Sequence, residues 1–348
     1  ISLLLLLLLA SCENKSKDNA TTVTANQQTY GTVNLVTFRH LVQDQEIVKA
    51  FEERYRLKVN VEVVPAATII RRAQEGVLGG DVVITPTLED IVRLKNFDQL
   101  QPFFVDAFSR GNVDDGYLDD QGYFAGLSRW TMAAVFNPNA VAIEEVSTYK
   151  NIAKLPLRGI RIGMAHPDSS GLAATVAGLT RIVNDRAATL WTKLLYDGLT
   201  GSMIGNDYDV MDRMLKGDLD VAFVSSGAAV RWFLNGNPTH FKAAEAWRVK
   251  YPATETDEVN FFNMTSIGVI KNAPNRPQAL QFIDFLFKKE NQEKMGDAIF
   301  EYPTEAFSIS NDYLSGIRGA PGRKISATET ASRLPLAWGI INQVASGE

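Results

Sequence analysis

Three polar segments in the second half of the chain stand where a small molecule could be bound. Asp168-Ser169-Ser170-Gly171 precedes an apolar helical stretch, Asn206-Asp207-Tyr208 begins another helix, and Ser225-Ser226 follows a strand-like run. A helix N-terminus leaves backbone N–H groups unpaired and carries partial positive charge, so an anion can bind there with help from serine hydroxyls. The alternative is that Asp168 or Ser169 only caps the following helix. The predicted ligand contacts are Ser169, Ser170, Gly171, Asn206, Asp207, Tyr208, Ser225 and Ser226.

Two arginines and one histidine could complete such a site. Arg39 and Arg129 would supply positive charge to an anionic solute, although a lone arginine is more often a solvated surface residue. His40 follows the first predicted strand, and the carboxyl ends of strands face the crevice in open α/β sheets. Three interpretations of His40 stay open: a ligand contact in a cleft, a cap of the next helix and, least favoured, a metal ligand.

Signals for catalysis are weak. Phe223-Val224-Ser225-Ser226-Gly227 is similar to a nucleophile turn but lacks the first glycine of G-x-S-x-G. The three histidines stand in no catalytic motif, and the sequence lacks the phosphate-loop, dinucleotide-binding and zinc-protease motifs. We therefore expect no enzyme activity and no catalytic residue, with a serine-type hydrolase as the weakest alternative.

Composition excludes several other classes of protein. The 348 residues include 35 Lys and Arg against 40 Asp and Glu, for a net charge of -5. Nucleic-acid binding needs concentrated positive charge, so we expect no nucleic-acid partner. A single cysteine cannot form an internal disulfide or a thiolate zinc site. A chain of this length is expected to form two domains.

The first twelve residues differ from the rest. Seven consecutive leucines, Leu3 to Leu9, suit the apolar region of a signal peptide and are too short for a membrane-spanning helix. Leu9-Ala10-Ser11-Cys12 resembles the lipobox of bacterial lipoproteins, in which Cys12 would carry the lipid. We expect residues 1–12 to be this signal peptide and residues 13–30 a flexible polar tether. The protein would then be exported and lipid-anchored on the periplasmic or outer face of a bacterial membrane; a buried leucine-rich helix with an incidental thiol is the alternative.

The elements that must position these residues alternate between strand and helix. Apolar runs predict strands at 33–37, 59–63, 81–84, 160–164 and 220–224, and helices at 47–55, 88–97, 171–183, 187–195, 207–215 and 277–288. The extended segments 123–137 and 261–270 are long enough to cross between two lobes. We expect two α/β lobes with mainly parallel sheets, the first from residues 31–132 and 264–300, the second from 133–263 and 301–348.

Several short motifs resemble one known family, the ferric-iron-binding extracytoplasmic proteins of bacterial ABC importers. The motifs occur in a common order from about residue 31 to the end. They are Phe38-Arg39-His40, Asp44-Gln45, Ala50-Phe51, 81–85, 124–128, Gly205-Asn206-Asp207, 217–224, 265–274, 279–286, Asn291-Gln292 and Glu301-Tyr302-Pro303. The resemblance implies a periplasmic-binding-protein-like α/β fold, with two lobes, two extended crossings and a ligand cleft between the lobes.

The resemblance departs from the family at the iron ligands. Members hold Fe(III) with tyrosine phenolates, because a hard trivalent ion prefers anionic oxygen donors. The adjacent tyrosines of the family are replaced here by Ser225-Ser226-Gly227-Ala228-Ala229, and two further tyrosine positions carry Leu41 and Phe136. The polar ligand position after the third strand falls at Thr85 and Thr87, without a carboxylate. We expect no cofactor and no metal ligand beyond the open case of His40, and Fe(III) itself remains open as a ligand.

The resemblance implies a lipid-anchored solute-binding protein of an ABC importer. It would close its lobes over a polar or anionic solute, or an iron–anion complex, and present this form to an ABC permease. We expect a monomer whose partners are the ligand, the permease and, through its lipid, the membrane. A two-lobe sensor or scaffold that has lost transport is the alternative.

Overall fold

The computed structural model describes residues 31–167, 171–201, 203, 205–256, 258–309, 312 and 325–347. The predicted signal peptide, tether and Cys12 lie outside the described residues, as do Ser169 and Ser170. Within the described ranges, no helix combines the length and apolar character needed to cross a membrane.

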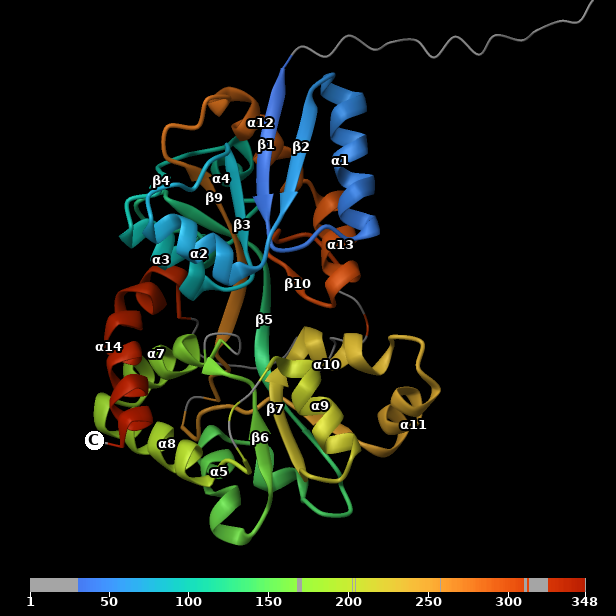
Figure 1. The fold of residues 1–348 in the computed structure, drawn as a ribbon, viewed down its shortest axis with the longest axis vertical. Coiled ribbons are helices and arrows are strands. Elements are labelled where there is room, and N and C mark those ends of the chain that lie inside the picture. The colour runs from blue at the N-terminus through green and yellow to red at the C-terminus, as the bar shows by residue number, and fades with distance from the viewer. Residues whose placement is uncertain are drawn as a thin grey trace, which may run out of the picture.

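The chain folds into two lobes, one above the other in Figure 1. The first lobe contains β1 (Thr32–Thr37), α1 (Val42–Tyr55), β2 (Lys58–Val63), α2 (Ala66–Gln74), β3 (Val82–Thr85), α3 (Leu88–Asn96), β4 (Leu100–Gln101), α4 (Asp106–Ser109), α12 (Arg276–Leu286), α13 (Lys289–Ile299) and β10 (Tyr302–Pro303). The second lobe contains α5 (Tyr149–Lys154), β6 (Ile162–Met164), α7 (Leu172–Ile182), α8 (Asp185–Gly198), α9 (Asp207–Leu215), β7 (Val221–Ser225), α10 (Ser226–Phe233), α11 (Pro238–Ala246) and β8 (Arg248–Lys250). Short 3-10 helices lie at Asp115–Tyr117, Ile143–Val146 and Leu155–Arg158.

Two long strands connect the lobes, as the extended segments of the sequence predict. The 13-residue strand β5 (Phe124–Phe136) pairs with β9 (Phe262–Ile270) along its first part. From Met132 onward β5 pairs with β7 of the second lobe instead. Because one continuous strand belongs to both sheets, a change in the angle between the lobes must be absorbed in β5 and β9.

The strands follow the order β2-β1-β3-β9-β5-β7-β6. The outer pairs β1–β2, β1–β3 and β6–β7 are parallel, as predicted. The prediction of mainly parallel sheets is wrong at the centre, where β9 and β5 run antiparallel to each neighbour. The crossings enter and leave a lobe in opposite directions, so they cannot both run with the parallel strands.

Residues after 300 begin in the first lobe. Tyr302 and Pro303 of β10 pair with Arg129 and Ser128 in the first-lobe part of β5. The expected boundary, with the second lobe starting again at residue 301, therefore does not match this pairing. Helix α13 of the first lobe ends at Ile299, beside β5. Only one residue stands between Ile299 and Glu301, so the chain is still in the first lobe when β10 begins.

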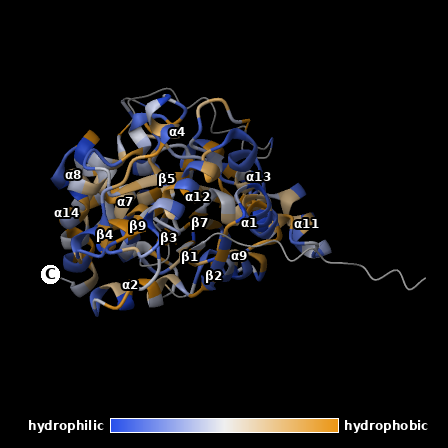
Figure 2. Ribbon diagram, turned by 90° about the horizontal axis from the view of Figure 1, so that it is seen from above, coloured by the Kyte–Doolittle hydropathy of each residue, from blue (hydrophilic) through white to orange (hydrophobic). Residues whose placement is uncertain are grey.

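One apolar cluster lies within the first lobe and another within the second, while a third runs from α2 and α3 through β5 to α7, α8 and α14 and so belongs to both lobes. In the first lobe, α1 packs on α12 through the edge-to-face pair Phe51 and Phe282, with ring centroids 4.9 Å apart. In the second lobe, α9 and α10 cover β7 with buried side chains such as Met211 and Trp232. Figure 2 shows hydrophobic colour on the central strands β5 and β9 and mixed colours on the surrounding helices. The central strands β3, β5, β7 and β9 are buried on both faces, because helices cover the sheet on each side.

The C-terminal helix α14 (Ala327–Ser346) is an element that the sequence patterns did not predict. It packs on α7 of the second lobe, where Arg181 pairs with Glu329 at 2.9 Å. It also reaches the first lobe, where the guanidinium of Arg93 in α3 lies 5.2 Å from the ring centroid of Trp338. Figure 1 shows α14 running down the side of the molecule from α3 to α8. The helix therefore contacts both lobes.

Candidate functional site

The first group of candidate residues meets at the start of α9. Asp207 is 8% exposed, and its Oδ2 accepts hydrogen bonds from the backbone N–H (3.0 Å) and the hydroxyl (2.6 Å) of Ser225. Burial raises the pKa of Asp207 above its ordinary value, and the hydrogen bonds from Ser225 oppose this shift. Nearby, Nε of Arg231 donates to the hydroxyl of Tyr208 at 3.3 Å. We call Asp207, Tyr208, Ser225 and Arg231 the Asp207 cluster.

The Asp207 cluster touches the first lobe. Nη1 of Arg231 donates to the carbonyl oxygen of Ile299 at the end of α13. A Cβ atom at Gly227 would lie only 2.7 Å from the same oxygen, so the backbones of α10 and α13 approach closely there. Ser226 is 1% exposed, and its hydroxyl accepts a hydrogen bond from the backbone of Thr131 on β5 at 3.3 Å. Ser226 thus fixes the start of α10 to the crossing strand.

Arg129 lies on β5 among three aromatic rings. Its guanidinium carbon is 5.2 Å from the ring centroid of Tyr117, 4.9 Å from that of Phe262 and 5.3 Å from that of Tyr302. Nη1 donates to the hydroxyl of Tyr117 at 2.6 Å. Cation–π contacts stabilise a partly desolvated guanidinium, so the rings hold this charge at the border of the two lobes without neutralising it.

A buried carboxylate that the site predictions missed lies beside this arginine. Glu301 is 7% exposed, and its Oε2 accepts hydrogen bonds from the hydroxyls of Ser128 (2.6 Å) and Thr265 (2.9 Å). The two serine and threonine donors belong to β5 and β9 of the first lobe. The sequence signal was only the motif Glu301-Tyr302-Pro303, which does not reveal burial.

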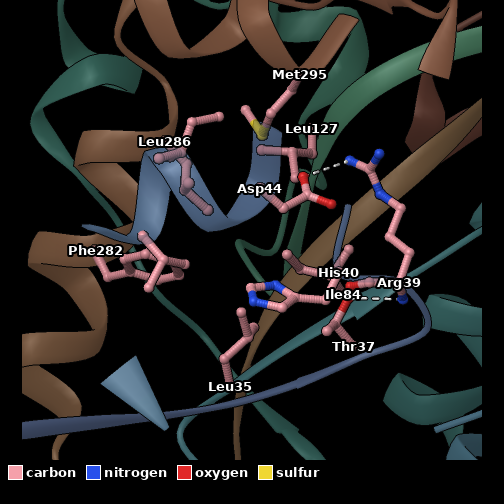
Figure 3. Close-up of a pocket in the computed structure, with 12 residues that line it drawn as sticks. Leu35, Thr37, Arg39, His40, Asp44, Ile84, Leu127, Phe282, Leu286 and Met295 are labelled. Atoms are coloured by element: carbon pink, nitrogen blue, oxygen red, sulfur yellow. Dashed lines mark hydrogen bonds and ion pairs between the residues drawn. The ribbon is translucent and has the colours of Figure 1, made fainter. Parts of the chain in front are cut away.

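Arg39 lies inside the first lobe, partly buried against α1. Its Nη2 is 3.6 Å from a carboxylate oxygen of Asp44, and the two side chains are 11% and 15% exposed. Figure 3 shows Arg39 reaching over the pocket toward Asp44. Asp44 also accepts a hydrogen bond from the backbone of Leu41 at 2.9 Å. The start of α1 is therefore capped by Asp44, and not by His40 as one interpretation held.

The imidazole of His40 points into a mostly apolar pocket of the same lobe, as Figure 3 shows. The pocket has a cavity of about 30 Å³, enough for one water molecule. Its lining includes Leu35, Ile84 and Phe282. The ring lies among side chains of the first lobe and is partly exposed, and the role of His40 as a ligand contact stays a prediction.

Three other candidates have local structural partners. Thr87 accepts a hydrogen bond from the backbone of Asp90 at 3.1 Å and is the N-cap of α3, and the hydroxyl of Thr85 donates to the carbonyl of Thr87 at 3.1 Å. Asn206 accepts a hydrogen bond from the backbone of Tyr208 at 2.9 Å and is the N-cap of α9. Thr87 and Asn206 cap the starts of α3 and α9, where a ligand could bind. The polar groups named here already form hydrogen bonds within the protein.

The lobes also meet where α3 faces α7. Oε1 of Glu89, in the first lobe, accepts a hydrogen bond from the backbone N–H of Ala174, in the second lobe, at 2.8 Å. Oε2 accepts a hydrogen bond from the amide of Asn263 on β9 at 2.7 Å. Glu89 is 5% exposed. We call Glu89, Asn263 and Ala174 the Glu89 contact. An acidic residue in the first turn of a helix is common, so the sequence patterns gave no reason to select it.

Gly171 forms the corner that allows this contact. It is the N-cap of α7 with φ of +65°, a region that favours glycine. A Cβ atom at Gly171 would lie 2.4 Å from the ring of Trp130 and 2.7 Å from the amide nitrogen of Asn263. A cavity of about 260 Å³ adjoins the contact and is lined by Thr87, Glu89, Asp90, Arg93, His166, Pro167, Gly171, Ala173, Tyr196, Trp338, Ile341, Asn342 and Ala345.

Three buried polar atoms at predicted site residues have no hydrogen-bond partner among the described residues. They are Nη1 of Arg39, Nε of Arg129 and Oδ1 of Asp207. Most buried polar atoms in native proteins are paired, so each exception marks a position where a water molecule or a ligand can supply the partner. All three belong to residues that the sequence had selected as ligand contacts.

The described residues contain no group of three or more His, Cys, Asp and Glu side chains that could hold a metal ion. The tyrosine of the Asp207 cluster, Tyr208, is 41% exposed and accepts its hydrogen bond from Arg231. A neighbouring cation opposes an additional Fe(III) charge, so this phenol is a poor starting point for an iron site.

Comparison with known proteins identifies a family profile that matches this chain. A profile described as "Bacterial extracellular solute-binding protein" matches residues 46–308. Among curated proteins, the chain is 26% identical over 301 residues to Iron uptake protein A1 of Synechocystis, covering 86% of this chain and 82% of that protein. It is 24% identical over 275 residues to Iron uptake protein A2 of the same organism, covering 78% of each.

Solved structures share the fold. A ferric binding protein from Campylobacter jejuni has a TM-score of 0.81 at 20% identity, covering 90% of this chain and 99% of that one. A Trichodesmium protein (IdiA, FutA) in complex with iron and citrate has a TM-score of 0.81 at 22% identity, with the same coverage. The predicted two-lobe α/β fold and the resemblance to ferric-binding proteins are confirmed. The family consists of binding proteins, not enzymes, as predicted, and because its profile matches more than half of the residues, the chain belongs to the bacterial extracellular solute-binding proteins.

Proposed function

We propose that this protein binds a small carboxylate-bearing anion, free or as a ferric chelate, and delivers it to an ABC permease. The observation that carries the proposal is Nε of Arg129, a buried donor at the border of the two lobes that has no hydrogen-bond partner among the described residues. Buried N–H groups of a guanidinium are stabilised by a carboxylate that accepts their hydrogen bonds. A planar anion is a good match for such donors because it can accept two hydrogen bonds from one arginine.

Asp207 favours a ligand that carries a hydrogen-bond donor as well as acceptor oxygens. Its Oδ1 has no partner among the described residues, and its pKa is raised by burial. A hydroxyl group on the ligand would donate to Oδ1, or a protonated Asp207 would donate to a ligand oxygen. Hydroxycarboxylates present both kinds of group. The ligand complex of the Trichodesmium protein, iron with citrate, makes citrate and ferric citrate the first probes to use.

Iron would enter this site as a chelate and not as a bare ion. By the family resemblance, the tyrosine positions carry Leu41, Phe136 and the segment Ser225-Ser226-Gly227-Ala228-Ala229 here. Phenolate ligands give Fe(III) its red-brown charge-transfer band, so the protein mixed with Fe(III) and an anion should lack that band. A visible band that disappears on replacing Tyr208 with phenylalanine would contradict this part of the proposal.

The decisive measurement is calorimetric titration with citrate, ferric citrate and phosphate. Arg129→Gln removes the charge held by the three rings and should weaken binding about tenfold to hundredfold, because a hydrogen bond to a charged group is lost. Arg161→Gln is the matched control, since Arg161 is 46% exposed and pairs only with groups of the second lobe such as Asp220 at 2.7 Å. Equal affinities of the Arg129 variant and the wild type would remove Arg129 from the site, and a wild type that binds none of the three anions would contradict the anionic ligand.

The anchor belongs to the same proposal. A lipid on Cys12 would keep the receptor at the membrane face where the permease lies, with residues 13–30 as the tether. Cys12→Ala should release the protein from the membrane fraction or leave it unprocessed. Membrane association equal to that of the wild type would contradict the lipobox interpretation.

A further inference from the structure

The first turn of α7 is completed by a side chain from the other lobe. The N-cap of α7 is Gly171, which has no side chain to cap the helix. The carboxylate of Glu89 takes that role by accepting the hydrogen bond from the N–H of Ala174, three residues into the turn, at 2.8 Å. Helix N-termini are anion sites because of their free N–H groups and partial positive charge. At the N-terminus of α7, this anion is the carboxylate of Glu89, a side chain of the protein itself.

The carboxylate is also tied to the crossing strand. The amide of Asn263 donates to Oε2 of Glu89 at 2.7 Å, and its Oδ1 accepts hydrogen bonds from the backbones of Leu88 and Met264, both at 2.8 Å. Since Oδ1 already accepts two backbone donors, the orientation of the Asn263 amide is determined. Glu89 therefore joins three segments: the start of α3, the strand β9 and the start of α7.

Separation of the lobes would break this arrangement. Glu89 and Leu88 belong to the first lobe and Ala174 to the second, and only Asn263 lies on a connection between them. If α7 moved away from α3, the N–H of Ala174 would lose its partner. Trp130 adds a second tie, because its Nε1 donates to the carbonyl of Pro86 at 3.3 Å and its ring contacts the position of Gly171.

We propose that Glu89 is an intramolecular latch, a carboxylate that holds the lobes together and occupies the anion position at the N-terminus of α7. This proposal depends on the proposed function in one respect only, namely that binding of a ligand would control the closure of the lobes. It predicts that the lobes of the ligand-free protein are largely closed. It also predicts that an anionic ligand is bound from the side of Arg129 and Asp207, because Glu89 already satisfies Ala174.

The latch is tested by inter-lobe distances measured with paired spin labels in the full chain without ligand. Labels on Gln74→Cys in α2 and Lys193→Cys in α8, both exposed, report on the two lobes, with Cys12→Ser removing the native thiol. The wild type should give one short distance. Glu89→Ala should raise the ratio of open to closed molecules about tenfold to hundredfold, the effect of losing hydrogen bonds to a charged group.

Two further variants keep the test interpretable. Glu89→Gln has the same size, but its amide nitrogen would face that of Asn263, so it should open the lobes to an intermediate degree. Glu301→Gln is the matched control, because Glu301 is also a buried carboxylate with two donors, and both donors belong to the first lobe. Its distance should equal that of the wild type even if its melting temperature falls. An unchanged distance in folded Glu89→Gln and Glu89→Ala would overturn the latch.

Rescue by a small anion tests the chemistry separately. The 260 Å³ cavity is lined by Glu89 and also by Gly171 and Ala173, so formate can reach Ala174 when the side chain is cut back to alanine. Formate should restore the short distance in Glu89→Ala, while chloride at equal ionic strength should not. Failure of formate to restore closure would contradict the anion role of Glu89. Neither distance measurement uses citrate, so failure of the ligand proposal would leave the result for the latch intact.

Discussion

Two of the places where the lobes meet, the Glu89 contact and the Asp207 cluster, differ in how completely their polar groups are paired. At the Glu89 contact, both carboxylate oxygens accept hydrogen bonds at 2.8 and 2.7 Å, one of them from the opposite lobe. At the Asp207 cluster, one carboxylate oxygen accepts two hydrogen bonds from Ser225, and the other has no partner among the described residues. Within the part of the chain that the structure describes, hydrogen bonding is therefore complete at the first place and incomplete at the second.

This difference separates a structural contact from a binding site. A buried carboxylate with all its partners in the protein stabilises one arrangement of the lobes. A buried polar atom without a partner costs free energy unless something else supplies the hydrogen bond. In our proposals, the ligand side is that of Arg129 and Asp207, whose Nε and Oδ1 have no partner among the described residues, and the N-terminus of α7 is the side that holds the lobes together.

The largest effect should come from Gly171→Ala. The added Cβ would lie 2.4 Å from the ring of Trp130 at a residue with φ of +65°. Overpacking and left-handed backbone strain together should lower the free energy of unfolding by about 2 to 4 kcal/mol, or else force the lobes apart.

Gly76→Ala is the matched control for Gly171→Ala. Gly76 has φ of +73°, with no atom within 4 Å of its added Cβ. Chemical denaturation of this variant should show only the strain, about 1 kcal/mol. Equal losses in the two variants would mean that packing at Gly171 does not hold the contact between the lobes.

Asp207→Asn should change how stability depends on pH. Burial raises the pKa of Asp207 above its ordinary value of 3.8 in the folded protein. The unfolded chain therefore releases this proton first, and the folded state loses relative stability as pH rises above about 4. The asparagine variant lacks this loss, so its stability relative to the wild type should increase between pH 4 and the raised pKa and then stay constant. Urea unfolding at pH 4, 5, 6 and 7 measures the difference; a difference that falls with pH would contradict the burial argument.

The smallest effect should come from Asp220→Asn, the variant in the same lobe with which Asp207→Asn is compared. Arg161 donates to Asp220 at 3.0 and 2.7 Å and lowers its pKa below the ordinary value of 3.8. The pair is partly solvated, so the variant should lose at most about 1 kcal/mol near pH 7. The sign is opposite to that of Asp207: the stability from Asp220 is present above its ordinary pKa and disappears as pH falls through the lowered value. Unfolding curves that differ from the wild type equally at pH 2 and pH 7 would show that charge is not the cause.

Local patterns predicted most of the elements. The expected helices at 171–183 and 207–215 correspond to α7 and α9, and the expected crossings at 123–137 and 261–270 to β5 and β9, within one or two residues. These segments have strong apolar periodicity or long apolar runs, which depend only on near neighbours in the chain. The C-terminal helix α14 was missed because it contains Pro335 and its buried side face is defined by α7, a distant segment.

The candidate site was predicted in part for the same reason. Helix starts such as Asn206 and strand ends such as Ser225 are visible in the sequence, since caps and strand boundaries are local features. Glu89 and Glu301 were not selected, because a glutamate in a helix turn or a loop has the same local signature whether it is solvated or buried. Their burial, 5% and 7% exposed, depends on partners far along the chain, such as Ala174 and Thr265.

The sequence by itself determined the two-lobe α/β architecture and the family resemblance, because both are properties of residue order. Only the tertiary structure decided which polar groups are paired. His40 turned out to lie among side chains of the first lobe, and the N-terminus of α7 received the carboxylate of Glu89. The pairing of a buried polar atom is a question of three-dimensional distance over about 3 Å, and residues 85 positions apart in the chain come within that distance only when the two lobes have folded and met.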